Sequence, residues 1–600
     1  MKKGESMNGK IRFCMAAAFA CSVFSAAHAA KSDVDKAVLT KYANAASFNG
    51  SQDVWGPLNC HDPKLFQDDD GTYYVYSTDA AIGGAGQKGL QIRTSTDLVH
   101  WQSLSKSAIQ RKWDKDWLKW VNFNMAQAST WAPTVIKQNG LYYLIHGIIT
   151  DSRSPGNPDA AIALAISSSP TGPFYPAAQA AAKDAKVGEV LSKLGVSYKQ
   201  SNIVRYTWYD RTWDDDDKSI SEQYCHNLAN YDTHTASEAD TAGGWAYGFG
   251  GIDPEFVTDV ATGKNVEYTI KGRKCWGLTY GSWKGGIALM YVDCVSLKPV
   301  NPADGSEIDA PADTVPGAFG TAIAGGYGAA YEGAQVIYNS ENGYYYCFVS
   351  MGNLDWDYRV GVGRSKNVTG PYIDGSGRSM YLDAMSASNF HEIGSKIIGG
   401  HALEKEFSFR CQGGQSILRA KDGKILFACH SRTNFLPGYF FFLQVHQLFF
   451  TDDGWPVLNQ NEYYGDKNFN EQLSSINKSN IAGNYDAVLT VRGTSASDYK
   501  PFGQNEPVTV VTADGVPTES KLVTLSVDGK VSGAYTGSWS LADDGYTFSV
   551  SLDGIGKFRG YVLEAVDWAR KKGKTRKTIT FTSFDGEKTG EYFWGNRREK

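Results

Sequence analysis

The fold is decided by the stretch Asn59-Cys60-His61-Asp62-Pro63, which is followed directly by Lys64-Leu-Phe-Gln-Asp-Asp-Asp-Gly-Thr-Tyr-Tyr-Val-Tyr-Ser77. An acidic residue stands beside a proline, and an apolar strand, an acidic turn and an aromatic strand come after it. This order is typical of a β-hairpin with a carboxylate at its entrance. We interpret Asp62 as a catalytic residue.

The same unit returns four more times along the chain with altered residues. The later copies begin at Trp131-Ala-Pro133, Ile252-Asp-Pro254, Tyr331-Glu-Gly333 and Gln412-Gly-Gly414. Five copies at intervals of roughly 70 to 80 residues, with one longer gap, are the signature of a repeat fold built from small sheets. The sequence therefore predicts an all-β chain whose main domain is a five-bladed β-propeller.

Three of the five copies carry an acid early in the repeat: Asp62, Asp253 and Glu332. The inner strands of a propeller converge on a central channel, so these residues should face one another across its mouth. Gathered carboxylates repel one another and are costly to desolvate, which favours a functional role. The alternative is that they cap turns or bind an ion, and for Asp253 alone, beside a proline, that alternative is the stronger one.

Four ordered motifs resemble those of glycoside hydrolase family 43: His61-Asp-Pro63, Trp131-Ala-Pro133, Ile252-Asp-Pro254 with Tyr280-Gly-Ser-Trp-Lys-Gly-Gly-Ile287, and Tyr331-Glu-Gly333. Leu443-Gln-Val-His-Gln-Leu448, Asp453-Gly-Trp-Pro456 and an extra C-terminal β domain are similar to the extracellular endo-1,5-α-L-arabinanases of that family. Each tripeptide is a weak signal alone, but four in order on a five-fold repeat are specific. The chain departs from the family pattern at Thr134, where an aspartate commonly follows Trp-Ala-Pro.

The resemblance implies a hydrolase that cleaves internal α-1,5-L-arabinofuranosidic bonds of arabinan with inversion. Asp62 would be the general base and Glu332 the general acid, while Asp253 would orient Glu332 and raise its pKa. We expect the substrate-binding residues to be Trp131, Trp283, Ser282 and His61, with the two tryptophans as sugar platforms. Either tryptophan could instead belong to the core of a blade.

The fifth copy has no acid at the position of Asp62, but it offers Gln415 and, in Cys429-His-Ser-Arg432, His430. The resemblance implies one calcium ion in the propeller channel, with His430 as the first candidate ligand and Gln415 as the second. The alternative is a histidine whose nitrogens bond to the backbone, because calcium prefers oxygen ligands.

Two other functions stay open at this point. An exo-acting α-L-arabinofuranosidase or β-xylosidase of the same family would use the same acids in a pocket closed at one end. Alternatively, the protein could be a non-catalytic propeller that binds carbohydrate and does not hydrolyse it.

The N-terminus has the pattern of an export signal. Basic residues precede an apolar run over residues 13–27 that closes with Ala27-His-Ala29. We therefore predict a signal peptide over residues 1–30 and a secreted protein, extracellular or periplasmic. No other stretch approaches about 18 apolar residues, so we expect no membrane anchor.

The amino-acid composition limits the classes of binding partner that we expect. A formal net charge of −5 argues against nucleic acid, which needs a concentrated basic face. Sixteen Trp and 34 Tyr suit packing against sugar rings, although most of them should serve blade packing. We expect a monomer whose partner is a polysaccharide, arabinan or the side chains of pectin.

Six hundred residues exceed one hydrophobic core, so several domains are expected. We predict a lead-in over residues 31–54, the propeller over 55–466, a linker over 467–480 and a small antiparallel β-barrel or sandwich over 481–600. An insertion at about 176–243 begins with helical spacing over 177–194. Its acidic run at 214–217 is either a calcium loop or, more plausibly on charge grounds, a solvated loop.

Seven cysteines remain after the predicted cleavage, so at least one thiol should be free. A single blade could allow Cys275 to pair with Cys294, and Cys411 with Cys429.

Overall fold

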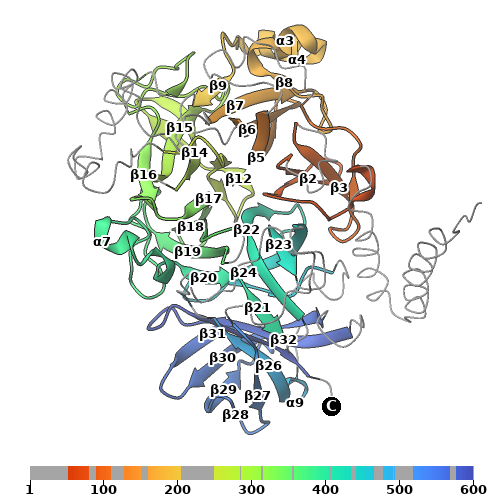
Figure 1. The fold of residues 1–600 in the computed structure, drawn as a ribbon, viewed down its shortest axis with the longest axis vertical. Coiled ribbons are helices and arrows are strands. Elements are labelled where there is room, and N and C mark those ends of the chain that lie inside the picture. Colours follow the sequence, from red (N-terminus) through yellow and green to blue (C-terminus); the bar gives the residue numbers. More distant parts are fainter. Residues whose placement is uncertain are drawn as a thin grey trace, which may run out of the picture.

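The computed structural model describes residues 52–79, 89–109, 128–150, 160–204, 249–283, 285–312, 315, 317–354, 357–403, 407–433, 441–464, 477–490, 492, 518–567 and 576–598. Strands dominate these residues and form five blades, followed by a closed barrel (Figure 1). The predicted all-β class, five-bladed propeller and C-terminal barrel are confirmed. The predicted signal peptide, the acidic run at 214–217 and Cys225 lie outside the described residues.

The first two blades are antiparallel sheets built outward from the channel. Blade 1 consists of β1 (Lys64–Gln67), β2 (Tyr73–Ser77), β3 (Gln91–Ser95) and β4 (Gln102–Ser103). Blade 2 consists of β5 (Ala128–Gln138), β6 (Leu141–Thr150), β7 (Ala160–Ser167) and β8 (Tyr175–Pro176), with β9 (Asn202–Val204) beside β7.

The other three blades follow the same plan with extra edge strands. Blade 3 consists of β10 (Glu255–Phe256), β14 (Arg273–Ser282), β15 (Gly286–Asp293) and β16 (Thr321–Ala324), with β13 (Glu267–Ile270) beside β14. Blade 4 consists of β12 (Lys264–Asn265), β11 (Thr258–Asp259), β17 (Tyr331–Asn339), β18 (Tyr344–Met351), β19 (Arg359–Ser365) and β20 (Ser395–Ile398). Blade 5 consists of β21 (His401–Leu403), β22 (Phe407–Arg419), β23 (Ile425–Thr433), β24 (Phe442–Phe450) and β25 (Pro456–Leu458).

Apolar side chains pack between neighbouring blades. The ring closes where Leu65 and Val75 of blade 1 pack in one cluster with Leu426 and Leu443 of blade 5. The segment before β1 also bonds to β24, because the Leu443 N–H donates to the carbonyl oxygen of Pro57 at 2.8 Å. The first and last blades are therefore held together by both packing and backbone hydrogen bonds.

In each repeat the chain adopts a left-handed backbone conformation at the point where it enters the channel. The five residues are Asp62, Ala132, Asp253, Gly333 and Gly414, with φ between 37° and 59°. Strand pairing shifts register at this point in β5, β17 and β22. The sequence comparison of the repeats places Glu332 at the position of Asp62. In the structure Gly333 has the left-handed conformation that Asp62 has, so that alignment is wrong by one residue and Glu332 lies just before the equivalent position.

The start of the predicted insertion forms two helices where the spacing suggested one. Helices α3 (Ala177–Lys183) and α4 (Ala185–Leu194) meet at Asp184, whose extended backbone ends α3. The Asp184 carboxylate accepts hydrogen bonds from the N–H groups of Lys186 and Val187 and so caps α4. No helix of the described residues is both long enough and apolar enough to cross a membrane.

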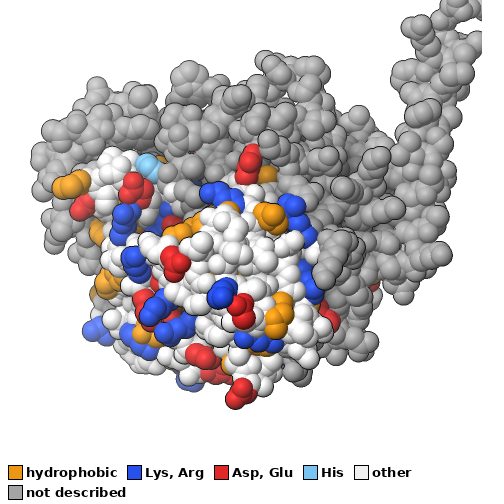
Figure 2. Space-filling model, turned by 90° about the horizontal axis from the view of Figure 1, so that it is seen from below, with side chains coloured by type: hydrophobic (Ala, Val, Ile, Leu, Met, Phe, Trp, Pro, Cys, Tyr) orange, Lys and Arg blue, Asp and Glu red, His pale blue; other side chains and the backbone are white. Residues whose placement is uncertain are grey.

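The C-terminal domain is a closed barrel in which each strand pairs with the next and the last with the first. Its strands are β26 (Gly483–Leu489), β27 (Lys521–Leu525), β28 (Lys530–Gly533), β29 (Gly537–Leu541), β30 (Thr547–Leu552), β31 (Gly556–Asp567), β32 (Arg576–Phe584) and β33 (Tyr592–Arg597). Its core contains aromatic side chains such as Trp539, Phe581 and Phe593. Acidic and basic side chains are interspersed over the described part of the face seen in Figure 2.

The barrel shares a core with blades 4 and 5. Phe584 and Tyr592 of the barrel lie in one buried cluster with Phe348, Phe427 and Trp455 of the propeller. The Tyr592 hydroxyl also donates to the carbonyl oxygen of Pro456 at 3.0 Å. The two domains are therefore packed as one body.

All six described cysteines are free, so the two suggested disulfides are wrong. Cys429 faces the core shared with the barrel, whereas Cys411 packs with Tyr358 and Phe441 at the channel end of blade 5. In blade 3, Cys275 is paired across the strands with Asp293 and not with Cys294.

Candidate active site

Asp62 is placed at the channel mouth by the residue pairing of blade 1. The register pairs Lys64 with Tyr76, so Thr78 lies opposite Asp62 and its hydroxyl donates to Oδ2 at 2.7 Å. Nδ1 of His61 lies 2.6 Å from the same oxygen. Burial acts to raise the pKa of Asp62, but His61, His430 and Thr78 outweigh it and lower the pKa to about 2. Asp62 is therefore an ionised acceptor at neutral pH.

Glu332 lies on β17, across the channel from blade 1. Its Oε1 accepts a hydrogen bond from the Tyr358 hydroxyl at 2.7 Å, and its Oε2 accepts one from the Ser282 hydroxyl at 3.1 Å. Burial raises the pKa of Glu332, the two hydroxyls oppose this, and the charge of Asp62 adds to the rise. Its environment thus favours the protonated acid more than that of Asp62 does.

Asp253 is the third acid at the mouth, directly before β10. Its Oδ2 accepts a hydrogen bond from the backbone N–H of Gly333 at 2.8 Å. Burial, followed by the charges of Glu332 and Asp62, raises the pKa of Asp253 well above its usual range. The three acids thus meet at one site, with one ionised carboxylate and two groups that favour a proton.

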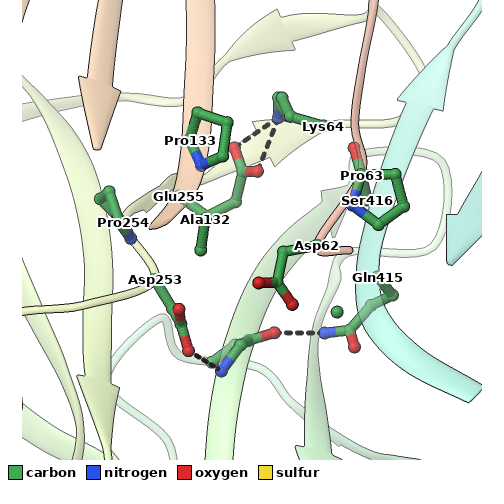
Figure 3. Close-up of a pocket in the computed structure, with 13 residues that line it drawn as sticks. Asp62, Pro63, Lys64, Ala132, Pro133, Asp253, Pro254, Glu255, Gln415 and Ser416 are labelled. Carbon is green, nitrogen blue, oxygen red and sulfur yellow. Dashed lines mark hydrogen bonds and ion pairs between the residues drawn. The ribbon is translucent and has the colours of Figure 1, made fainter. Parts of the chain in front are cut away.

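The channel around Asp62 and Asp253 is lined by the same part of each repeat (Figure 3). The lining residues are Asp62, Pro63, Lys64, Ala132, Pro133, Asp253, Pro254, Glu255, Gly333, Ala334, Gly414, Gln415 and Ser416. Nζ of Lys64 lies 2.6 Å from both carboxylate oxygens of Glu255, and the Thr134 hydroxyl donates to Glu255 at 2.8 Å. A buried ion pair therefore joins blades 1 and 3 across the channel, and the Thr134 hydrogen bond adds blade 2.

Thr134 takes part in this network because a threonine hydroxyl can donate to a carboxylate. The aspartate that the family pattern would place here could not do so when ionised. The departure from the pattern at Thr134 therefore matches the buried Glu255 that lies opposite.

Gln415 and Nδ1 of His430 have other partners, whereas Nε2 of His430 is buried without a hydrogen-bond partner among the described residues. The Gln415 side chain donates to the carbonyl oxygens of Gly333 and Phe348, and its Oε1 accepts from Ser350 at 2.7 Å. Nδ1 of His430 accepts the N–H of Asp62 at 3.1 Å. Burial lowers the pKa of His430 well below its usual range, so the ring is neutral and carries its proton on Nε2.

These residues do not fit a calcium ion held directly by His430 and Gln415. A protonated ring nitrogen is a donor and not a metal ligand. His61, Asp62 and His430 do bring potential ligand atoms within 4.8 Å of one another. Two nitrogens and one carboxylate are nevertheless far from the oxygen-rich set that calcium prefers.

Two of the four predicted substrate-binding residues contact the acids. Ser282 bonds to Glu332 and His61 bonds to Asp62. Trp131 is half-buried one residue before Ala132, packs against the cluster that contains Ile252, and donates from Nε1 to Ser129 at 3.0 Å. Trp283 is half-buried in the turn that follows Ser282.

Thr78 and Tyr358 are site residues that the sequence reasoning missed. The pairing of the β1–β2 hairpin could have identified Thr78, because that pairing brings it opposite Asp62. Tyr358 precedes β19, and nothing in its spacing distinguishes it from the many other tyrosines.

Both domains of the chain resemble known proteins. Residues 53–240 match the model of glycosyl hydrolases family 43, and residues 461–595 match a C-terminal lipocalin-like domain. The chain is 26% identical over 563 residues to an extracellular endo-α-(1→5)-L-arabinanase of Thermotoga petrophila, covering 90% of this chain and 94% of the relative. It is 24% identical over 585 residues to extracellular endo-α-(1→5)-L-arabinanase 2 of Bacillus subtilis, covering 94% of this chain and 97% of that relative.

A solved structure shares the fold. The crystal structure of the endo-1,5-α-L-arabinanase from Thermotoga petrophila RKU-1 matches with a TM-score of 0.60 at 23% identity, covering 91% of this chain and 99% of that one. The chain therefore carries a glycosyl hydrolases family 43 domain and, after its propeller, a C-terminal lipocalin-like domain.

Proposed function

We propose that this protein is a secreted enzyme that hydrolyses internal α-1,5-L-arabinofuranosidic bonds of arabinan with inversion of configuration. The observation that carries the proposal is the pairing of an ionised Asp62 on blade 1 with a buried, proton-favouring Glu332 on blade 4, at one channel mouth. Relatives named as extracellular endo-arabinanases, which align over at least 90% of both chains, support the substrate and the export.

The reaction needs one proton acceptor and one proton donor. Asp62 takes a proton from a water molecule as the water oxygen attacks the anomeric carbon. The bond from that carbon to the leaving oxygen breaks, and Glu332 gives its proton to that oxygen. Attack from the side opposite the leaving group inverts the anomeric configuration in a single step.

The pKa values support this division of roles. A base must be ionised before the reaction, and the pKa of Asp62 is lowered to about 2. An acid must still hold its proton, and burial raises the pKa of Glu332. Asp253 adds a third carboxyl whose own pKa is raised by burial and by Glu332, so that the buried pair resists holding two negative charges.

The test is a pair of isosteric substitutions assayed on linear arabinan. Glu332→Gln and Asp62→Asn should each reduce kcat by about 10²- to 10⁴-fold, the usual contribution of a general acid or base. Wild-type enzyme should release oligosaccharides of mixed length early in the reaction. NMR should show that the anomeric carbon of the first product has inverted configuration. Unchanged hydrolysis in Glu332→Gln would refute the mechanism. Release of arabinose alone would indicate exo action, and a retained anomer would exclude inversion.

Calcium dependence and the monomeric state stay predictions. Titration calorimetry with Ca²⁺ on chelator-treated protein would test the first, and analytical ultracentrifugation would test the second. No step of the reaction described above passes through a metal ion.

A further inference from the structure

Three aromatic rings form a stack between the two carboxylates assigned to the reaction. The rings of His61 and His430 lie 4.4 Å apart with an angle of 20° between their planes. The rings of His430 and Tyr358 lie 5.6 Å apart with an angle of 10°. His430 is therefore the middle ring of the stack, between His61 and Tyr358.

Each end of this stack bonds to a different acid. Nδ1 of His61 lies 2.6 Å from Oδ2 of Asp62, and the hydroxyl of Tyr358 donates to Oε1 of Glu332 at 2.7 Å. The middle ring also holds the base, because Nδ1 of His430 accepts the N–H of Asp62. A continuous path of ring contacts and hydrogen bonds thus runs from Asp62 to Glu332.

The surroundings leave the rings little freedom to move. His430 is fully buried and Tyr358 is 2% exposed. The ring of Phe441 meets those of His61 and His430 edge-on, at 4.6 and 4.5 Å. A rigid stack of this kind can fix the position of a residue on one blade relative to a residue on another.

The backbone of blade 5 also accommodates the stack. A Cβ atom on Gly413 would lie 2.2 Å from the Tyr358 ring. A Cβ atom on Gly414 would lie 2.8 Å from Nδ1 of His430. Both contacts are too short for any side chain, so these two positions require glycine.

We propose that this stack fixes the separation and orientation of the general base and the general acid, with Tyr358 as the positioning residue for Glu332. The inference rests on the proposed function. Asp62 and Glu332 lie on different blades, so small shifts between blades would misplace one relative to the other, and such shifts are costly to catalysis. The stack contacts both acids directly and so couples their positions.

The hydroxyl of Tyr358 has a second consequence for the acid. The hydroxyl of Tyr358 donates to Oε1 of Glu332 and that of Ser282 donates to Oε2, so the two bonds fix the orientation of the carboxyl group that delivers the proton. A tyrosine needed only for packing could be a phenylalanine without loss.

The test compares Tyr358→Phe with wild type on two substrates of different leaving group. Arabinohexaose releases a poor leaving group that needs the proton of Glu332, whereas an aryl α-1,5-arabinotrioside with a dinitrophenol leaving group does not. Tyr358→Phe should lower kcat on arabinohexaose by about 10- to 100-fold, and on the aryl substrate by about threefold or less. KM should change little, because no substrate contact is removed.

Tyr331→Phe is the matched control. Tyr331 is also fully buried and precedes Glu332, but its hydroxyl has no partner among the residues the structure describes. It should behave as wild type on both substrates. Thermal melting of both variants, with transitions close to wild type, confirms that the fold is kept.

The outcomes separate this inference from the proposed function. If wild type hydrolyses arabinohexaose and Glu332→Gln abolishes it, the proposed function stands. If Tyr358→Phe then loses activity equally on both substrates, or no more than Tyr331→Phe does, the positioning role is refuted. If wild type hydrolyses neither substrate, the proposed function fails and the inference fails with it.

Discussion

The backbone N–H of Gly333 donates to Oδ2 of Asp253 at 2.8 Å, so the acid of blade 3 holds the main chain next to Glu332. Asp253 therefore contacts the main chain beside Glu332, and the charge of Glu332 in turn raises the pKa of Asp253. These two interactions can be separated by substitution.

Asp253→Asn should keep the hydrogen bond to Gly333 and remove the ionisable group. We expect kcat on linear arabinan to fall by about 10- to 100-fold while the melting temperature changes little. Asp253→Ala should also lose stability, by about 1–3 kcal/mol, because the Gly333 N–H loses its partner. Wild-type kcat in Asp253→Asn would mean that Asp253 is only a backbone anchor.

Thr78→Val should move the acid limb of the pH profile. The Thr78 hydroxyl helps to lower the pKa of Asp62 to about 2, so its removal raises that pKa. The base must be ionised, so activity at low pH should be lost earlier, with the acid limb of kcat/KM displaced upward by roughly one pH unit. Thr582→Val, in the barrel, is the control and should leave the profile unchanged. An acid limb that stays in place would show that Thr78 does not tune the base.

Gly414→Ala should abolish most activity. A Cβ atom at this position would lie 2.5 Å from Oδ1 of Asp62. The variant also carries the backbone strain of a left-handed residue, about 1–2 kcal/mol. Gly140→Ala shares that strain, with φ of 73°, but its Cβ atom would meet nothing within 4 Å. Stability should fall in both variants and kcat much further in Gly414→Ala; equal kcat values would contradict the steric argument.

Lys64→Met should destabilise the propeller. Lys64 and Glu255 are 10% and 9% exposed, so the substitution leaves a carboxylate buried without its cation, at a cost of about 3–5 kcal/mol. Lys193 and Glu189 form an exposed pair on α4, and Lys193→Met should change the free energy of unfolding far less than Lys64→Met does. Urea denaturation measures both. A small effect of Lys64→Met would mean that water or a proton replaces the lost charge.

The fold could be predicted because the hairpin unit recurs five times, and each copy carries enough apolar and aromatic residues to form a blade. In the C-terminal domain, the Asp-Gly turns marked the ends of the strands. The three acids could be found because they lie at the start of a repeat. The position of Glu332 relative to Asp62 could not be derived, because backbone conformation decides it: Gly333, and not Glu332, is left-handed.

Contacts between segments that are distant in the chain also could not be predicted from the sequence. Tyr358 meets Glu332 only because β17 and β19 belong to one sheet, and His430 meets Asp62 only because the last blade closes on the first. The same holds for the surroundings of the predicted calcium ligand Gln415, whose role as a ligand stays a prediction. The hydrogen-bond partners that occupy Gln415 come from blade 4, far away in the chain.

The core shared by the barrel and blades 4 and 5 makes the tail part of the catalytic geometry, although no barrel residue is assigned to the reaction. Strand β17 carries both Glu332 and Ile337, and β23 carries both Phe427 and His430, so each strand has one end at the acids and the other in the shared core. A chain ending at residue 464 would uncover Trp455, whose ring lies 4.9 Å from that of Phe584. The acid and the middle ring of the stack would then sit on strands that had lost their outer support.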